Sequence, residues 1–458
     1  MALTGRAGLL ALLGVVVVLI APRPGLAVLG VGLVVAALVA ADLALAGSVR
    51  GLRFQRAGDT LVRLGQQAEV ELIVENPGGR RVRGLLRDAW PPSADNTPRR
   101  HRLDVPAGER RRLVTALRPR RRGDSRAVTV TVRAFGPLGL AARQGSHRVP
   151  WTVRVLPPFL SRKHLPARLA QLRELDGRHP ALVRGQGTEF DSLREYVAGD
   201  DVRSIDWRAT ARRGDVVVRT WRPERDRRVL IVLDTGRTSA GRVGEAPVPL
   251  AGAVAPRSQY ADPADVALPE AGWPRLDWSM DAALLLAALA ARAGDRVDFL
   301  AYDRAVRAWV PGASRTELLS TMVNAMAPVE AELVESDSAG MVAEILAKAR
   351  RRCLVVLLTD LNPAALDEGL LPLLPRLSSR HLVLLAAVAD PRVAAMAAGR
   401  GSPELVYDAA AAEHTLGERH KLTARLRRQG VEVVDALPDD IAPALADTYL
   451  ALKASGRL

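Results

Sequence analysis

The sequence predicts a multidomain membrane protein in three parts: an N-terminal transmembrane helical hairpin, a β-sandwich and a C-terminal α/β domain with a parallel sheet. Two apolar stretches open the chain, and short alternating strands broken by turn residues follow them. Buried apolar runs then alternate with helical patterns, which is typical of a parallel α/β sheet. The expected boundaries are 1–50 for the hairpin, 51–157 for the sandwich, 158–228 for a linking segment and 229–458 for the α/β domain.

The two apolar stretches are residues 7–21 and 26–46, separated by Pro22-Arg23-Pro24-Gly25. The second has the length of a bilayer span, whereas the first is shorter and also suits a signal peptide. We favour a tight membrane hairpin, because the apolar run resumes directly after the small residues near Ala27.

The flanking charges predict the orientation of this hairpin. The loop between the spans carries only Arg23, and the outer flanks carry Arg6, Arg50, Arg53 and Arg56. The positive-inside rule therefore predicts a two-span protein of the cell membrane whose soluble domains are cytoplasmic.

From about Phe54 to Leu156, strands such as 69–75, 112–117 and 127–133 alternate apolar with polar residues. This spacing predicts an antiparallel sandwich of immunoglobulin-like kind. Arginines at the outward positions predict a positive face, which either attracts anionic lipid headgroups or is simply solvated.

The α/β domain is predicted from apolar runs buried on both faces. The expected strands are 229–233, 296–302, 354–359, 382–388 and 431–434. The expected helices are 280–293, 317–326, 340–350 and 420–429, after a linker helix at 165–175. Residues 240–275 are rich in Pro, Ala and Gly and predict a loop inserted between the first strand and its helix.

Composition narrows the function classes. The net charge is +15, and residues 99–122 alone hold ten arginines. No zinc knuckle or basic stripe interleaved with aromatics accompanies them, so nucleic-acid binding is the least favoured hypothesis. The single cysteine, Cys353, excludes an intramolecular disulfide and is expected to be inert core.

The densest pattern of the chain is Gly187–Arg219, where acids and arginines alternate around apolar residues. One interpretation is a surface helix-turn-helix with ordinary ion pairs. The other is a fixed lattice of Arg–Asp pairs around Trp207, since arginine can hold a carboxylate at two points. If Trp207 is buried as an anchor on the sheet, its truncation is expected to cost about 3–5 kcal/mol. The candidate binding residues are Arg194, Glu195, Asp200, Asp201, Arg203, Asp206, Trp207 and Arg212.

This order of residues resembles the signature of the domain-of-unknown-function family 58. The pattern runs through Leu193-Arg194-Glu195-Tyr196, Gly199-Asp200-Asp201, Arg203, Ile205-Asp206-Trp207 and Ala211-Arg212. Proteins of that family occur in bacteria and archaea beside MoxR-type AAA+ ATPases. The resemblance implies such an ATPase as the partner, but no established activity.

Two acids are predicted to lie where ligands bind in an open parallel sheet, beyond the carboxyl ends of the strands. They are Asp234, after the first strand, and Asp360, after 354–359. The arrangement resembles the Rossmann-like von Willebrand factor type A domain, whose metal site uses Asp-x-Ser-x-Ser after its first strand. Here the motif reads Asp234-Thr235-Gly236-Arg237-Thr238, which is a degenerate form because Gly236 lacks a hydroxyl.

The resemblance implies a Mg²⁺ site at Asp234, Thr238 and Asp360, with a further hydroxyl expected from Ser314 or Thr316. A divalent cation needs about six oxygens, so the missing hydroxyl weakens the predicted site. The alternative is that both acids serve as helix caps or as partners of arginines.

We expect no catalytic residues, since the sequence has no phosphate loop, zinc-binding helix or nucleophile elbow. The preferred hypothesis is a membrane-anchored adaptor that works with a MoxR-type ATPase in remodelling or assembling proteins. A metal-dependent hydrolase acting on envelope components is the alternative, and a nucleic-acid binder is the third. The sequence leaves the client, the oligomeric state and the role of 240–275 open.

Overall fold

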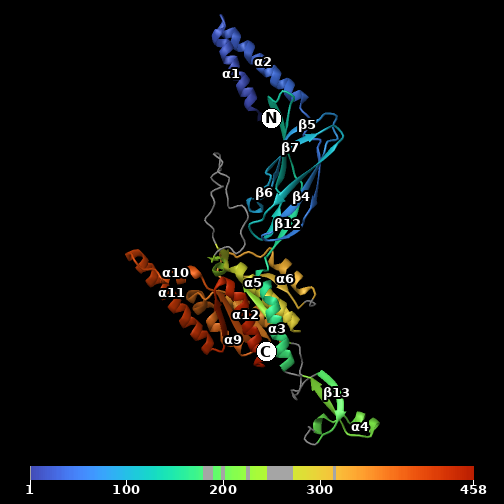
Figure 1. Ribbon diagram of the computed structural model, residues 1–458, viewed down its shortest axis with the longest axis vertical. Coiled ribbons are helices and arrows are strands. Elements are labelled where there is room, and N and C mark those ends of the chain that lie inside the picture. The colour runs from blue at the N-terminus through green and yellow to red at the C-terminus, as the bar shows by residue number, and fades with distance from the viewer. Residues whose placement is uncertain (1, 179–188, 198–201, 223–226, 245–271, 313–315) are drawn as a thin grey trace. The chain divides into compact units, whose positions relative to one another are not determined.

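The computed structural model describes residues 2–178, 189–197, 202–222, 227–244, 272–312 and 316–458 (Figure 1). The described residues separate into two compact units at the junction between Pro158 and Phe159. The predicted end of the sandwich, residue 157, lies one position before the last residue on the N-terminal side of this junction.

Two apolar helices begin the first unit. They are α1 (Gly5–Ile20) and α2 (Pro24–Leu45), close to the two stretches predicted from the sequence. Helix α2 is long and apolar enough to cross a membrane, and α1 is a shorter apolar helix. Pro24 suits the start of α2, because the first helical position needs no backbone N–H donor. These helices support membrane anchoring of the chain near its N-terminus.

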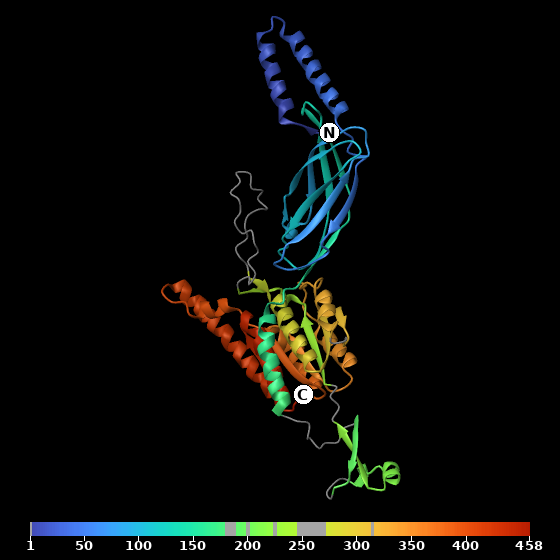
Figure 2. The same ribbon diagram turned by 45° about the vertical axis from the view of Figure 1, so that its right-hand side comes forward.

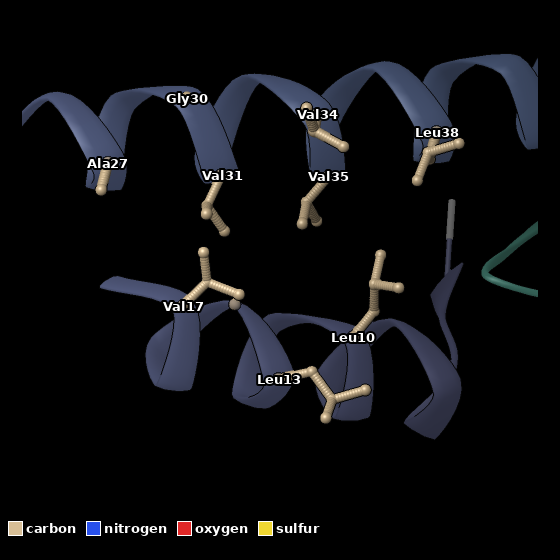
Figure 3. Close-up of a pocket in the computed structure, with 10 residues that line it drawn as sticks. Leu10, Leu13, Val17, Ala27, Gly30, Val31, Val34, Val35 and Leu38 are labelled. Carbon is tan, nitrogen blue, oxygen red and sulfur yellow. The ribbon is translucent and has the colours of Figure 1, made fainter. Parts of the chain in front are cut away.

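The two helices contact each other through small and β-branched residues. Figure 3 shows Leu10 and Val17 of α1 pointing toward α2. Residues of both helices line an open apolar groove of about 500 Å³. At Gly14 the helices are in close contact, since an added Cβ would lie 2.3 Å from Val31 Cγ1. The glycine therefore permits a separation that any side chain would increase.

Asp42 attaches α2 to the sandwich. Its carboxylate is fully buried and accepts hydrogen bonds from the backbone N–H groups of Leu138 (2.7 Å), Leu140 (2.7 Å) and Ala141 (2.8 Å). A Cβ at Gly136 would lie 2.2 Å from Asp42 Oδ1, so only glycine allows this approach. These contacts explain why an apolar helix carries an acid near its end.

The sandwich consists of two larger sheets and one small one. The first sheet has the order β1 (Ala2–Leu3), β11 (Ala141–His147), β10 (Thr129–Phe135), β5 (Val82–Ala89) and β7 (Arg100–Val105). The second has the order β2 (Arg53–Gly58), β4 (Ala68–Glu75), β8 (Arg110–Leu117) and β6 (Asn96–Thr97). The small sheet has the order β3 (Leu61–Arg63), β12 (Thr152–Leu156) and β9 (Gly123–Arg126), and a short helical turn, η1, covers Pro92–Ala94.

The core of the sandwich lies between its two larger sheets. Leu72 and Val74 of β4 pack in one cluster with Leu86 of β5 and Val132 of β10. The side chains of β4 alternate between buried and partly exposed, as the sequence pattern predicted. Two of the three strands named in the sequence analysis, 69–75 and 112–117, lie within β4 and β8, and the third, 127–133, overlaps β10.

A buried ion pair crosses this core. Arg56 donates to both oxygens of Asp88, at 2.5 and 3.0 Å, and to the carbonyl of Val149 at 3.0 Å. The indole N–H of Trp90 donates to Asp88 at 2.9 Å. Both charged side chains are almost completely shielded from solvent.

The second unit contains a six-stranded sheet flanked by helices. Its order is β19 (Val306–Val310), β18 (Arg296–Tyr302), β15 (Arg228–Asp234), β20 (Leu354–Leu358), β21 (Leu382–Val388) and β22 (Glu432–Ala436). The five predicted strands are parallel to one another. The edge strand β19 is antiparallel to β18, so the sheet is mixed rather than purely parallel. This short strand, Val-Arg-Ala-Trp-Val, is exposed at its start and lacks the continuous apolar run of the others.

Helices cover both faces of this sheet (Figure 2). One face packs against α5 (Arg275–Arg292) and α12 (Pro438–Ala454), beside α6 (Leu318–Met326) and α3 (Leu165–Arg178). The other packs against α7 (Ser338–Lys348), α11 (Pro403–Arg428) and the turns between β20 and β21. Those turns are α8 (Pro363–Ala365), η6 (Leu366–Leu370), η7 (Leu371–Leu373) and α9 (Leu374–Ser378), and α10 (Pro391–Ala397) follows β21.

Several elements of this unit differ from the sequence-based predictions. The helix predicted at 420–429 is only the end of the longer α11, and α12 and the turns after β20 were not predicted. Residues 245–271 of the predicted insertion lie outside the described residues. Its two ends pair as β16 (Arg242–Val243) and β17 (Trp273–Pro274), after the turn η4 (Arg237–Ala240).

Asp281 of α5 holds the beginning of the second unit. Its carboxylate accepts the backbone N–H of Ser161, at 3.1 and 3.2 Å, in the turn η2 (Leu160–His164). Burial raises the pKa of Asp281 to about 6, although the hydrogen bonds from Ser161 act in the opposite direction.

Replacing Asp88 with Asn is expected to destabilise the sandwich by about 3–5 kcal/mol, because Arg56 is left as a buried charge without its partner. Hydrogen exchange of the β5 and β10 amides in the full chain measures this loss. The matched control is Asp104→Asn, whose ion pair with Arg81 is about half exposed and whose loss should leave exchange near wild type. Equal protection in both variants would contradict the prediction.

Stability of the second unit should depend on pH through Asp281. The folded chain keeps a proton on Asp281 up to about pH 6, whereas the ordinary pKa of the group is 3.8. Its ionisation therefore opposes folding, and stability falls by on the order of 3 kcal/mol as pH rises from about 4 to above 6. Asp281→Asn keeps an acceptor for Ser161 and should flatten this fall. Urea unfolding followed by circular dichroism at several pH values compares the two profiles, and parallel profiles would refute the assignment.

Candidate functional site

The three predicted metal ligands gather at one edge of the sheet. Strand β15 ends at Asp234, and its parallel neighbour β20 is followed by Thr359 and Asp360. Because parallel strands end at the same edge, both acids lie there, as expected for ligand sites of open sheets. Together with Thr238 of η4 they line a pocket of about 330 Å³, which we call the Asp234 pocket.

The carboxylate of Asp234 is held by uncharged donors. One oxygen accepts the backbone N–H of Gly236 at 2.9 Å and the hydroxyl of Ser336. The other accepts the Thr359 hydroxyl at 2.7 Å. Asp234 is only 6% exposed. The described part of the chain therefore supplies this buried carboxylate with hydrogen bonds but with no cation.

Asp360 has cationic partners instead. Its two oxygens accept from Arg275 Nη1 at 3.1 Å and from Arg419 Nη1 at 3.0 Å. Arg419 also makes a two-point pair with Asp435, both contacts at 2.7 Å. Burial lowers the pKa of Arg419, but the hydrogen bonds and charges of Asp435 and Asp360 outweigh it, and the net effect raises the pKa. The result is a closed group of two acids and two arginines.

These contacts decide how well the residues suit a divalent cation. Among the residues that the structure describes, no three His, Cys, Asp or Glu side chains form a metal-binding group. Asp234 offers one carboxylate and neighbouring hydroxyls, but both oxygens of Asp360 are already bound to guanidinium groups. The described residues thus fit Mg²⁺ less well than a set of two open carboxylates would.

The sequence analysis did not identify two hydroxyl groups that line the Asp234 pocket. Ser314 lies outside the described residues, and Thr316 does not line the pocket, whereas Ser336 and Thr359 both contact Asp234. The position of Thr359, directly after a buried strand and before Asp360, was visible in the sequence. Ser336 lies in the loop before α7, and only the fold brings it to this edge.

The signature segment forms a small module of its own, which we call the signature module. Its strands β13 (Glu189–Glu195) and β14 (Val217–Arg222) pair antiparallel, and η3 (Val202–Ser204) and α4 (Trp207–Arg213) lie between them in the chain. The helix-turn-helix interpretation is therefore wrong for the described residues. The run Val217–Val218 is buried in the hairpin, and β-branched residues favour strands.

Asp206 organises this module. Its carboxylate caps α4 by accepting the N–H groups of Arg208 and Ala209, both at 3.0 Å, and accepts from Arg219 Nε at 2.8 Å. The Ala209 N–H and the Arg219 guanidinium lower the pKa of Asp206 below its usual value. Gly214 ends the helix with a left-handed backbone, as glycine commonly does. One Arg–Asp pair of the proposed lattice is thus present.

Trp207 is not the buried anchor that one interpretation of the sequence predicted, because its side chain is 66% exposed. Tyr196, Val202 and Val216 of the same module are also exposed. Among the other candidate residues, Arg194 donates to the Glu195 carbonyl at 3.1 Å, Arg203 lies in η3 and Arg212 in α4. Asp200 and Asp201 lie outside the described residues.

A protein-family model matches residues 192–246 and 274–433 of the chain. It is the model of DUF58, described as a protein of unknown function. The matched residues, which we call the DUF58 region, include Asp206 and Trp207 of the signature module and the two acids Asp234 and Asp360. The Asp234 pocket and most of the signature module therefore lie inside the match.

Curated relatives of the chain carry no functional description. Uncharacterized proteins of Mycobacterium bovis and of Mycobacterium tuberculosis are 27% identical to it over 221 residues, which is 48% of this chain. The chain spans 60% of the length of these relatives.

Among solved structures, part of the chain is similar to the CARDB domain of a Pyrococcus furiosus protein in complex with di-metal ions. The similarity covers 23% of this chain and 91% of the chain of that domain. Its identity is 17% and its TM-score 0.17. A β-glucosidase from Listeria innocua covers 23% of this chain and 16% of its own, with 13% identity and a TM-score of 0.15.

Arg419→Met is expected to destabilise the carboxyl edge of the sheet by about 1–3 kcal/mol, because Asp435 loses its two-point partner and Asp360 keeps only Arg275. The matched control is Arg425→Met on the same helix, whose exposed pair with Asp367 should contribute about 0–1 kcal/mol. Urea unfolding of the full chain in detergent compares the two. A loss of equal size in both variants would show that the ion pairs of Arg419 contribute no more to stability than an exposed ion pair.

Proposed function

We propose that this chain is a membrane-anchored adaptor that binds a partner protein through its DUF58 region. By the resemblance of the signature, the proposed partner is a MoxR-type AAA+ ATPase, and the pair remodels or assembles other proteins at the cytoplasmic membrane. The proposal includes a two-span hairpin of α1 and α2 with both soluble units in the cytoplasm. The proposal also assigns an immunoglobulin-like fold to the sandwich and a von Willebrand factor type A-like fold to the α/β domain.

The exposure of Trp207 carries this proposal. Tryptophan is large and apolar, and it is enriched at the energetic centres of protein interfaces. Trp207 begins a short helix whose N-terminus is fixed by Asp206, so the indole stands on a rigid support. A preorganised aromatic side chain loses less conformational freedom on binding than a flexible one.

The exposed charges of the signature module support recognition of a charged partner. Glu195, Arg203, Arg208 and Arg212 are exposed, as are the apolar residues of the same module. A polar rim around an apolar centre is the usual anatomy of a protein interface, and its charges set specificity more than affinity. No described contact favours the hydrolase or the nucleic-acid binder over this function, and Mg²⁺ at Asp234 stays a prediction.

The test is a pull-down with the full-length protein from lysate of its own cells, with and without ATP and Mg²⁺, read by mass spectrometry. We expect capture of a MoxR-type ATPase that depends on nucleotide. Trp207→Ala should reduce this capture by about tenfold or more, because truncating a central interface aromatic costs upward of 2 kcal/mol of binding. The stability of the protein should change by less than about 0.5 kcal/mol, since the indole is exposed.

Tyr407→Ala is the matched control, because Tyr407 is also an exposed aromatic and lies on α11, outside the signature module. It should leave capture unchanged. Capture that survives Trp207→Ala moves the contact elsewhere on the chain. A complete absence of the ATPase from every lane would overturn the choice of partner.

A further inference from the structure

The Asp234 pocket combines an apolar wall with an acidic mouth. Its inner side is formed by Val232 and Leu357 of the sheet and by Met341, Leu366 and Leu370 of the helices that cover it. Asp234, Glu335, Asp360 and Glu368 line it with carboxylates, against one arginine, Arg237. At about 330 Å³ it lies at the lower end of the range for small-molecule sites.

The charges of this lining are not balanced by the described residues. Glu335 is paired with Arg237 at 2.8 Å, and Asp360 is bound by Arg275 and Arg419. Asp234 and Glu368 have no ion pair within the described ranges. The pocket therefore presents two uncompensated negative charges, one of them buried.

A buried carboxylate is stabilised far better by a cation than by hydroxyl donors alone. Three hydrogen bonds orient the Asp234 carboxylate at the pocket, but Ser336 and Thr359 bring no charge. The group that would complete this site carries a positive charge at one end and an apolar stem behind it. Lysine and arginine side chains have this construction, since their methylene stems pack on apolar surface while the head stays at polar groups.

The same contacts distinguish this ligand from a metal ion. A Mg²⁺ ion demands an octahedron of oxygens close around it, and it cannot use an apolar wall. Here Asp360 is occupied by two guanidinium groups, Gly236 offers no hydroxyl, and much of the lining is Leu, Met and Val. An organic cation can contact both the carboxylates and the apolar wall of the pocket.

We propose that the Asp234 pocket binds a lysine or arginine side chain of the partner protein. This inference rests on the proposed adaptor function and names the chemistry that the pocket recognises. Asp234 binds the charged head from inside, Glu368 attracts it at the mouth, and Met341, Leu366 and Leu370 contact the stem. The site then recognises a basic residue directly, without a bridging metal.

The first experiment pans a phage library of random peptides against the full-length protein in nanodiscs, in parallel with Asp234→Asn and Glu368→Gln. Asp234→Asn keeps an acceptor for Gly236 and Ser336, and Glu368 is exposed, so both variants should fold. Wild-type protein should enrich peptides with Lys or Arg at one fixed position, and both variants should lose this enrichment. Glu413→Gln, an exposed acid of α11 that pairs with Arg400 away from the pocket, is the matched control and should behave as wild type.

The second experiment measures the best enriched peptide against the same peptide with norleucine in place of its basic residue. Fluorescence anisotropy should show binding about tenfold tighter for the basic peptide, equivalent to about 1.4 kcal/mol, with equal affinities in Asp234→Asn. Equal enrichment of basic and neutral peptides overturns the proposal. Enrichment of acidic peptides that requires added Mg²⁺ also overturns it, since that result means a metal-bridged site.

These experiments distinguish a failure of the pocket proposal from a failure of the adaptor proposal. If the ATPase is captured equally by wild type and Asp234→Asn and no basic peptide is enriched, the pocket inference is wrong and the adaptor function stands. If basic peptides are enriched but no ATPase is ever captured, the pocket inference stands and the partner is wrong.

Discussion

The two-sided burial of strand β15 is the constraint on which the candidate site depends. Residues Val229–Leu233 are buried on both faces, because β18 and β20 flank the strand and helices cover the sheet above and below. A shift of one residue would move every side chain to the opposite layer, where its size and shape no longer match its neighbours, so close packing holds the register. That register ends the strand at Asp234 and sets Thr359 and Asp360 beside it. The packing of the core therefore fixes the geometry of the pocket.

Four of the buried acids that the structure describes are stabilised in three different ways. Asp42 uses three backbone N–H groups, which lets an apolar helix end on the sandwich without a counter-ion. Asp88 and Asp360 use guanidinium groups, which fix them in closed ion pairs. Asp234 uses hydroxyls and one N–H, which orient its charge but do not neutralise it. This difference separates a residue suited to binding from residues suited to structure.

The DUF58 region thus carries two features suited to recognition of another protein. The signature module presents Trp207 on a capped helix, and the Asp234 pocket presents a carboxylate behind an acidic mouth. An aromatic contact supplies binding energy with little regard to sequence, whereas a charged pocket selects one kind of side chain. Joined to an apolar anchor, the two would let one chain hold and select a partner at a membrane surface.

The sequence alone determined the elements whose patterns are local. Apolar length predicted α1 and α2, alternation predicted the sandwich strands, and continuous apolar runs predicted five strands of the sheet, since each follows from which faces of an element are buried. The placement of Asp234 and Asp360 together also followed, because parallel strands end at one edge. Tertiary structure decided what these patterns do not contain: the hairpin of the signature module, the exposure of Trp207, and the partners of each acid. Ser336 lies 102 positions from Asp234 in the chain, and Arg419 lies 59 from Asp360. No local period relates such residues, so only the packing of helices and loops around the sheet brings them into contact.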